Sequence, residues 1–297
     1  MGCSVRAVDT RRVHAGGSHL PRRRKIYASL LLCVMLAMGS GHAPAAPGVF
    51  VGDFETGNFD QWAICQDAEL GSAACTELRA PHYNMQVQSN FVRQGRFAAQ
   101  FQLRQGDRPP GLCCGDRAEV SGEAATAADE GDEFWYQWST LFGADFPTDS
   151  GWSVVAQWHA NRDGSPPVAI ASRPDFGPDR WGLYISTWIS PGNPGPTFTP
   201  WSAPLARGGW HDIKLRIKWS ANDYSGFIEL WHNGVPQTFT AAPCAGETRC
   251  RVRTLMPEGG GVYFKQGYYR DTGIAAPGSV YHDGFSLAIS EADLRPL

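Results

Sequence analysis

The chain has 297 residues, with 26 basic and 29 acidic side chains and a formal net charge of −3. Seven basic residues and one acidic residue lie in the first 45 positions, which leaves 19 basic and 28 acidic residues and a net charge of −9 over the remaining 252. This balance excludes a broadly basic surface, so we expect neither nucleic acid nor a membrane as a partner. An anionic ligand would have to bind in a local basic groove.

The first 45 residues have the composition of a secretory signal peptide. Basic residues at 22–25 precede the apolar run "IYASLLLCVMLAM", and Ala43-Pro44-Ala45 offers a small-residue cleavage site. The apolar run is too short for a comfortable membrane span. We predict that residues 1–45 direct export by the general secretory route, with a twin-arginine route left open. Residues 46–297 are then expected to form a single domain, secreted or periplasmic, and monomeric.

Six cysteines follow this leader, and an even number in a secreted chain indicates disulfides. They are Cys65, Cys75, Cys113, Cys114, Cys244 and Cys250. The first two and the last two are close enough in sequence to close short loops. The adjacent middle two are expected to bridge each other only with strain. A metal site is less favoured because no Cys-x-x-Cys spacing occurs.

Ten short alternating or aromatic-rich runs, separated by Gly, Pro, Asn and Asp, predict strands. In chain order they are 85–92, 97–104, 116–122, 133–142, 153–160, 181–188, 211–219, 226–233, 262–269 and 281–289. Asn233-Gly234 predicts a hairpin turn after the eighth run. No useful helical periodicity is present, and many short strands at even spacing predict an all-β sandwich or jelly roll.

Two of these strands carry polar pairs on one face, because side chains of a strand alternate with period two. Arg117 and Glu119 point the same way in "DRAEV". Gln157 and His159 do so in "AQWHA", with Trp158 on the opposite, core-facing side. Each pair alone is more often a structural or surface feature than a site.

The run "YFKQGYYRD" at 263–271 supplies a third polar face. Lys265, Gly267 and Tyr269 share it, and the missing side chain at Gly267 predicts a gap where a ligand lies against the backbone. If the three strands belong to one sheet, they line a groove with Arg, Gln, His, Lys and Tyr. This set suits proton abstraction next to a carboxylate, since cations and amides stabilise the developing charge while His or Tyr moves protons. The expected reaction is β-elimination at a uronic acid.

The motifs "DRAEV", "QWH" and "YFKQGYYRD" resemble, in order and spacing, three signatures of the β-jelly-roll polysaccharide lyases, including the alginate lyases. "GDFETGNFDQW", "GWSVVAQWHA" and "YHDGFSLAIS" are similar to the heparin lyase I and glucuronan lyase branch. The resemblance implies a concanavalin-like jelly roll, a sandwich of two antiparallel sheets with a concave substrate groove. It also implies cleavage of glucuronan, alginate or a heparin/heparan-like polymer without a catalytic cofactor. The charge of −9 favours a non-sulfated polyuronide.

The resemblance also implies roles for individual residues. Arg117 and Gln157 would bind and neutralise the uronate carboxylate, and His159 would be the base or its helper. Tyr269 would be the acid, or both acid and base in a syn elimination, with Lys265 supporting it electrostatically.

The same families often carry a structural calcium on the convex side. Asp53, Glu55 and Asp283 are the matching candidates, although "DFETG" and "HDG" also fit ordinary turn chemistry.

Two other functions compete with a lyase. A sandwich-fold glycoside hydrolase would need a Glu-x-Asp-x-x-Glu strand or another carboxylate pair, and "ADEGDEFW" lacks that spacing. A non-catalytic carbohydrate-binding module would explain the 11 Trp, but gives no reason for the three polar faces to coincide.

Overall fold

The computed structural model describes residues 50–147, 151–162 and 164–297. The predicted signal peptide and its cleavage site lie outside these residues. The strands of the described part are β1 Phe50–Gly52, β2 Ile64–Asp67, β3 Gly71–Ala74, β4 Met85–Gln88, β5 Ala98–Leu103, β6 Asp116–Ser121, β7 Glu133–Phe142, β8 Ser153–Ala160, β9 Val168–Ser172, β10 Arg180–Ser190, β11 Asn193–Pro204, β12 Trp210–Lys218, β13 Phe227–His232, β14 Val235–Pro236, β15 Cys250–Arg251, β16 Val262–Arg270 and β17 Gly278–Ala288. Short 3-10 helices lie at Cys75–Glu77, Glu123–Thr126, Pro174–Phe176 and Glu291–Asp293.

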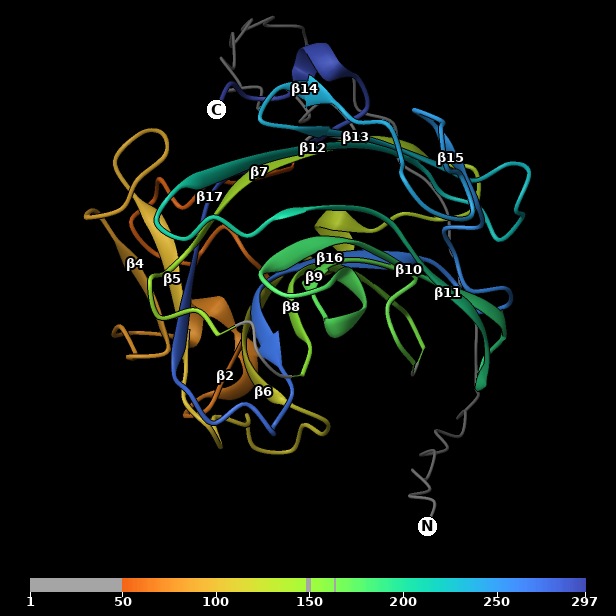
Figure 1. Cartoon of the computed structure of the whole chain (residues 1–297). Helices are drawn as coiled ribbons and strands as arrows, with labels where there is room; N and C mark the ends of the chain where they lie inside the picture. The colour runs from red at the N-terminus through yellow and green to blue at the C-terminus, as the bar shows by residue number, and fades with distance from the viewer. Residues whose placement is uncertain (1–49, 148–150, 163) are drawn as a thin grey trace, which may run out of the picture. The chain divides into compact units, whose positions relative to one another are not determined.

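The strands form two antiparallel sheets packed face to face (Figure 1). One has nine strands in the order β14-β13-β12-β7-β17-β5-β4, with β1 added on β17 and β15 on β13. The other has eight strands in the order β11-β10-β9-β8-β16-β6-β2-β3. The all-β prediction of a jelly roll with two antiparallel sheets is confirmed. The three strands that carry the polar motifs, β6, β16 and β8, are direct neighbours in the eight-stranded sheet.

All ten predicted strands are present, but the sequence pattern missed several others. The longest of these is β11, whose 12 residues include four prolines. A proline has no N–H to give to a sheet, so a proline-rich strand is confined to an edge. β11 is indeed the edge of the eight-stranded sheet. The predicted hairpin is confirmed: Asn233 and Gly234 have φ of 50° and 76° between β13 and β14, as a two-residue type I′ turn requires.

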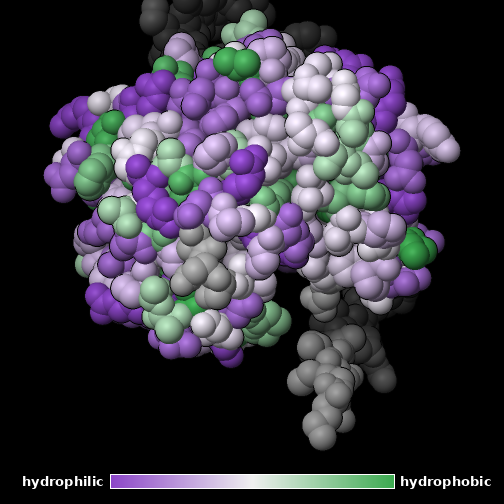
Figure 2. Space-filling model, viewed as in Figure 1, coloured by the Kyte–Doolittle hydropathy of each residue, from purple (hydrophilic) through white to green (hydrophobic). Residues whose placement is uncertain are grey.

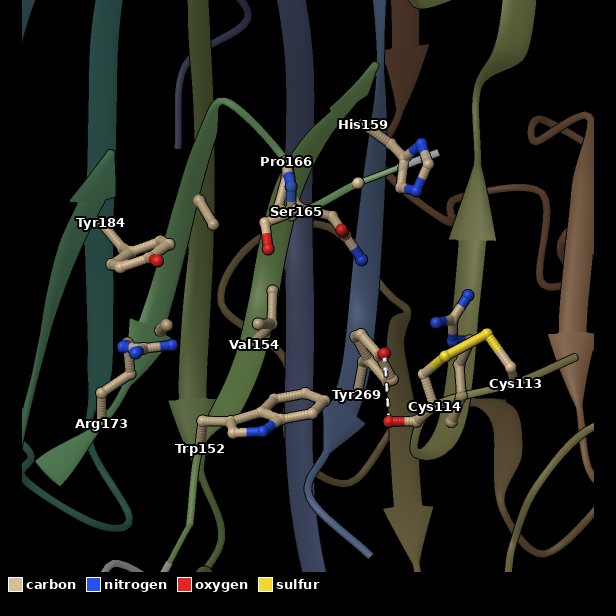
Figure 3. Close-up of a pocket in the computed structure, with 15 residues that line it drawn as sticks. Cys113, Cys114, Trp152, Val154, His159, Ser165, Pro166, Arg173, Tyr184 and Tyr269 are labelled. Carbon is tan, nitrogen blue, oxygen red and sulfur yellow. Dashed lines mark hydrogen bonds between the residues drawn. A yellow bond between two sulfur atoms is a disulfide. The ribbon is translucent and has the colours of Figure 1, made fainter. Parts of the chain in front are cut away.

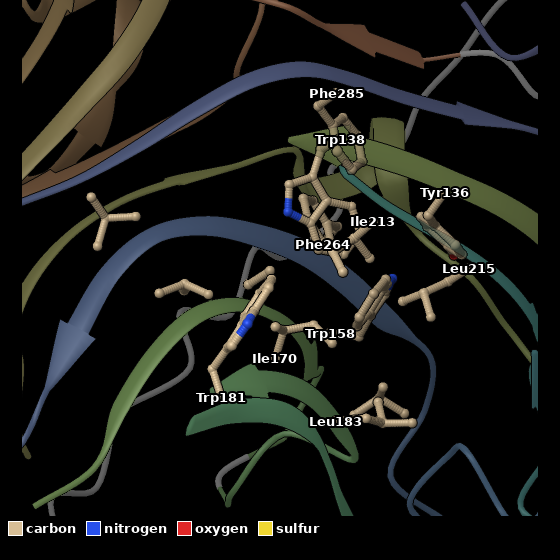
Figure 4. Close-up of a cluster of buried hydrophobic side chains, with 14 of the residues drawn as sticks. Tyr136, Trp138, Trp158, Ile170, Trp181, Leu183, Ile213, Leu215, Phe264 and Phe285 are labelled. Carbon is tan, nitrogen blue, oxygen red and sulfur yellow. The ribbon is translucent and has the colours of Figure 1, made fainter. Parts of the chain in front are cut away.

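Aromatic side chains fill the space between the sheets (Figure 4). Trp158 of β8 and Phe264 of β16 point inward from the eight-stranded sheet, with ring centroids 5.1 Å apart. Phe264 stacks on Phe285 of β17 at 4.3 Å, which ties the two layers together. The prediction that Trp158 faces the core is confirmed, since the residue is fully buried. Because Trp158 and Phe264 face inward, the residues beside them on each strand face away from the core.

The surface view shows mostly hydrophilic residues with smaller apolar patches between them (Figure 2).

The structure pairs the six cysteines as Cys65–Cys75, Cys113–Cys114 and Cys244–Cys250. In the described part of the chain, no helix is long and apolar enough to span a membrane.

The stack of Phe264 on Phe285 predicts a large effect of truncation. Phe264→Ala should lower the free energy of unfolding by about 3–5 kcal/mol, because it leaves a cavity between the sheets. Chemical denaturation followed by Trp fluorescence measures this change. Tyr224→Ala, at a position 86% exposed, should change stability by less than about 0.5 kcal/mol. Equal effects at both positions would contradict the assignment of Phe264 to the core.

Candidate active site

A groove of about 580 Å³ lies on the face of the eight-stranded sheet that points away from the core (Figure 3). Four of the five predicted catalytic residues line it: Arg117 from β6, Gln157 and His159 from β8, and Tyr269 from β16. The strand register brings them together. Tyr269 is the cross-strand partner of Arg117, and the Arg117 guanidinium carbon lies 3.9 Å from the centre of the Tyr269 ring. This is a cation–π contact inside the groove.

A buried carboxylate, Glu119, lies beneath these residues. Its Oε2 accepts a hydrogen bond from Lys265 Nζ at 2.7 Å and is 3.2 Å from Arg117 Nε. Its Oε1 accepts a hydrogen bond from Gln157 Nε2. Burial alone would favour the neutral acid, but the charges of Lys265 and Arg117 hold the pKa of Glu119 below its ordinary value. Glu119 is therefore ionised, and it anchors the two cations and the amide at the floor of the groove.

Lys265 lies beneath the groove and does not line it, and its electrostatic support of Tyr269 stays a prediction. The side chain of Lys265 is only 3% exposed. Its ammonium group donates to Glu119 and, at 2.6 Å, to Gln66 Oε1. Alternation placed Lys265 on the correct face of β16, but a buried ammonium needs a carboxylate, and Glu119 on the neighbouring strand provides one.

His159 is held in one tautomer. Its Nδ1 lies 2.7 Å from the carbonyl oxygen of Ala160, which can only accept, so Nδ1 carries the proton and Nε2 keeps its lone pair. Burial lowers the pKa of His159, and the nearby charge of Lys265 lowers it further. The imidazole is therefore neutral near pH 7. A neutral imidazole with a free lone pair can accept a proton.

Tyr269 lies at the centre of the groove wall. Its hydroxyl donates to the carbonyl oxygen of Cys114 at 3.4 Å, drawn as a dashed line in Figure 3. Its ring also packs edge-to-face against Trp152 at 4.6 Å. The Arg117 guanidinium contacts the same ring. The phenol is therefore held on several sides and still lines the groove.

Gly267 does not leave a gap for a ligand, contrary to the sequence interpretation. A Cβ at this position would collide with the backbone of β6, 2.7 Å from Glu119 Cα, and the residue has φ of 150°. It lies at an irregularity in the pairing of β16 with β8. Behind it, His282 Nε2 lies 2.9 Å from the Gly267 carbonyl oxygen. The glycine is thus required by the close approach of β6, and it places Glu119 against β16.

Comparison with known proteins agrees with this geometry. A family model described as polysaccharide lyase matches residues 54–286. This chain belongs to the polysaccharide lyase family. No curated protein sequence matches the chain. As a family member with this fold, the protein is a lyase that acts on a polysaccharide.

Solved structures share its fold. The chain is similar to an endo-β-1,4-glucuronan lyase from the fungus Trichoderma reesei, with a TM-score of 0.60, 19% identity, and coverage of 82% of this chain and 97% of that chain. It is similar to a family 7 alginate lyase in complex with product, with a TM-score of 0.52, 13% identity, and coverage of 80% of this chain and 99% of that chain. It is also similar to the catalytic domain of a family 131 glycoside hydrolase from Coprinopsis cinerea, with a TM-score of 0.52, 13% identity, and coverage of 82% of this chain and 95% of that chain. Since lyases and a hydrolase share the fold, the chemistry has to be argued from the groove of this lyase itself.

The opposite end of the groove contains residues that the sequence interpretation missed. The guanidinium carbon of Arg173 lies 4.2 Å from the centre of the Tyr184 ring, and both residues line the groove. Between them and Tyr269, small side chains such as Ala169 and Ala171 of β9 form an apolar floor. Alternation along β10 could have placed Tyr184 on the groove face, because Leu183 points into the core. Nothing in the sequence marks Arg173.

The predicted calcium ligands have other partners. Asp53 accepts a hydrogen bond from Gln61 at 2.8 Å, while Glu55 and Asp283 accept hydrogen bonds from backbone N–H groups of the 93–97 segment. Burial raises the pKa of Asp283 to about 6. Within the residues that the structure describes, no group of three or more His, Cys, Asp or Glu side chains is arranged to hold a metal. The calcium prediction therefore gains no support.

The environment of His159 predicts its titration. Its imidazole should titrate below about pH 6.5, the value of an unperturbed histidine, because burial and Lys265 both disfavour the charged form. NMR titration of the ring protons measures this. Lys265→Met removes the repelling charge and should move the midpoint to higher pH, whereas Lys218→Met on the other sheet should not. A midpoint above 6.5 in the unmodified lyase would contradict the described environment.

Proposed function

We propose that this lyase is an exported enzyme that cleaves a uronate-containing polysaccharide by β-elimination, with the chemistry in the groove of the eight-stranded sheet. One observation carries the proposal: Arg117, Gln157, His159 and Tyr269 reach one groove from three adjacent strands. Export is supported by the leader composition and by three disulfides, which persist in oxidising compartments.

Arg117 and Gln157 bind the uronate carboxylate in this mechanism. A guanidinium has five N–H donors. Arg117 Nε lies 3.2 Å from Glu119 Oε2 as an ion pair, and one terminal nitrogen donates to Gln66 Oε1 at 3.3 Å, which leaves donors for a ligand. Gln157 donates one of its two amide hydrogens to Glu119 and has a second for the substrate. Two cations, Arg117 and Lys265, face the single carboxylate of Glu119, so this group of residues has a net positive charge. That charge stabilises the negative charge that develops on the uronate when the C5 proton leaves.

His159 and Tyr269 transfer the protons. A base takes the C5 proton, the electron pair forms the C4=C5 double bond, and the C4–O bond breaks toward the leaving oxygen. The acid then gives that oxygen a proton. His159 Nε2 offers the lone pair for the first step, and the Tyr269 hydroxyl offers the proton for the second. A syn elimination would use Tyr269 in both steps.

Lys265 acts through other groups in this proposal. It pairs with Glu119, and its charge helps keep His159 neutral. It is therefore a positioning residue rather than one that touches the sugar.

Arg173 favours a substrate with more than one acidic sugar. Arg173 and Arg117 lie on opposite sides of the groove floor, with the strands β16 and β8 between β6, which carries Arg117, and β9, which Arg173 directly follows. Neighbouring strands are spaced by about 4.8 Å, so a bound polymer crosses several strands and meets both cations. A polyuronide such as a glucuronan fits this spacing of positive charge and the predicted charge of −9. The similarity in fold to a glucuronan lyase is consistent with it.

The groove argues against hydrolysis. Among the described residues that line it, none is Asp or Glu, whereas glycoside hydrolases generally use a pair of carboxylates. A non-catalytic binding module, the other function considered from the sequence, would not need His159 in a fixed neutral tautomer.

Removal of the phenol oxygen tests the chemistry. Tyr269→Phe should reduce kcat by about 10²–10⁴-fold, because it removes the proton donor while keeping the ring that Arg117 and Trp152 contact. The assay is ultraviolet absorbance of the conjugated unsaturated product on glucuronan, alginate, heparan sulfate, hyaluronan and a neutral glucan. Tyr224→Phe is the matched control. Flat traces on every glycan, with binding equal in both variants, would favour the binding module.

Arg173→Ala tests the second cation. We expect KM for a polyuronide to rise about tenfold or more, since a charge-assisted contact contributes about 1.5–3 kcal/mol, while kcat changes little. The control is Arg251→Ala, which removes an exposed arginine on β15. An unchanged KM would remove Arg173 from the binding site.

A further inference from the structure

The Cys113–Cys114 disulfide lines the groove, and none of the proton-transfer or carboxylate-binding steps involves it. Both of its cysteines are exposed, whereas those of Cys65–Cys75 and Cys244–Cys250 are buried. Figure 3 shows its sulfur atoms beside Tyr269. A stabilising staple has no need to face a substrate groove.

The turn that contains this disulfide packs tightly against the strand of Tyr269. Cys114 supplies the carbonyl oxygen that accepts the Tyr269 hydroxyl. The next residue, Gly115, has no room for a side chain, since a Cβ there would lie 2.5 Å from the carbonyl oxygen of Arg270 and against the Tyr269 ring. Any movement of this turn therefore moves the partner of the Tyr269 hydroxyl.

The conformation of Cys114 depends on its surroundings. Its φ is 83°, in the left-handed region that favours glycine and disfavours other residues. Such a backbone persists only where neighbouring structure enforces it. On one side the bond to Cys113 restrains the residue, and on the other the chain enters β6 at Asp116, which is fully buried beside Arg270 at 3.8 Å.

We propose that the Cys113–Cys114 disulfide positions the Tyr269 hydroxyl for proton transfer and forms an apolar wall of the groove that contacts the sugar next to the cleaved bond. The disulfide holds Cys114 in the left-handed conformation, so its carbonyl oxygen fixes the position of the phenol oxygen, and the O–H turns from this carbonyl to the leaving oxygen when it donates its proton. The two sulfurs present a surface without hydrogen-bond donors, which suits the C–H face of a sugar ring. The inference rests on the proposed function of Tyr269, and it makes Cys113 and Cys114 positioning residues.

The test is selective reduction of the folded lyase. A dithiol reductant, itself oxidised to a cyclic disulfide, converts the exposed Cys113–Cys114 bond to two thiols, and mass mapping verifies which bond has opened. We expect kcat on the polyuronide to fall about 10- to 100-fold, as misplacement of a catalytic group does, and to recover on reoxidation. The near-ultraviolet circular dichroism of the core should not change. Cys113→Ser/Cys114→Ser should show the same loss without a reductant.

Two comparisons separate positioning from general stability and from the proposed chemistry. Cys244→Ser/Cys250→Ser removes a disulfide elsewhere in the chain and should keep kcat wherever it folds. In the Tyr269→Phe variant, reduction of the Cys113–Cys114 bond should still weaken polymer binding, because the apolar wall is disturbed although there is no phenol hydroxyl to position. Calorimetry measures this binding. Unchanged kcat and KM after verified reduction would overturn the inference while leaving the lyase mechanism intact. A protein without activity in either redox state would instead contradict the proposed function.

Discussion

The buried carboxylate of Glu119 is the contact on which the groove depends. It lies on β6, and it binds Lys265 from β16 and Gln157 from β8 while pairing with Arg117 on its own strand. Three adjacent strands are thereby fixed in register at the level where the substrate binds. Removal of one partner from such a buried ion pair is strongly destabilising, of the order of 3–5 kcal/mol, because it leaves an uncompensated charge. The network therefore supports the fold and sets the positive charge of the site.

The alternation of β16 connects this network to the core. Phe264 and Tyr268 point between the sheets, while Lys265 and Tyr269 point the other way. Any slip of register by one residue would exchange the two sets. Aromatic packing in the core and ion pairing under the groove thus enforce the same register, and Gly267 allows β6 to approach closely enough for both.

Much of this was predictable from the sequence. Period-two alternation gave ten strands and the groove faces of Arg117, Gln157, His159 and Tyr269, since the face of a side chain depends only on local geometry. It failed where partners come from elsewhere in the chain. Lys265 is on the expected face, yet its ammonium is withdrawn to Glu119.

The same reasoning explains the residues that were missed. Arg173 follows β9, and only the order of strands in the folded sheet places it in the groove. The calcium candidates Asp53, Glu55 and Asp283 accept hydrogen bonds from protein groups, and the calcium site stays a prediction. The bond between Cys113 and Cys114 was considered from their adjacency, but its place in the groove depends on a turn that alternation does not describe.

The masses of the oligosaccharide products test the central claim, that the groove performs elimination and not hydrolysis. Elimination cuts the chain without adding water. Each oligosaccharide that carries a new non-reducing end should therefore be lighter by one water than the hydrolytic product of the same length. Mass spectrometry of a polyuronide digest by the purified protein makes the distinction. Products lacking that water would agree with proton transfer by His159 and Tyr269. Products that have gained it would contradict the account and place a hydrolase in this fold.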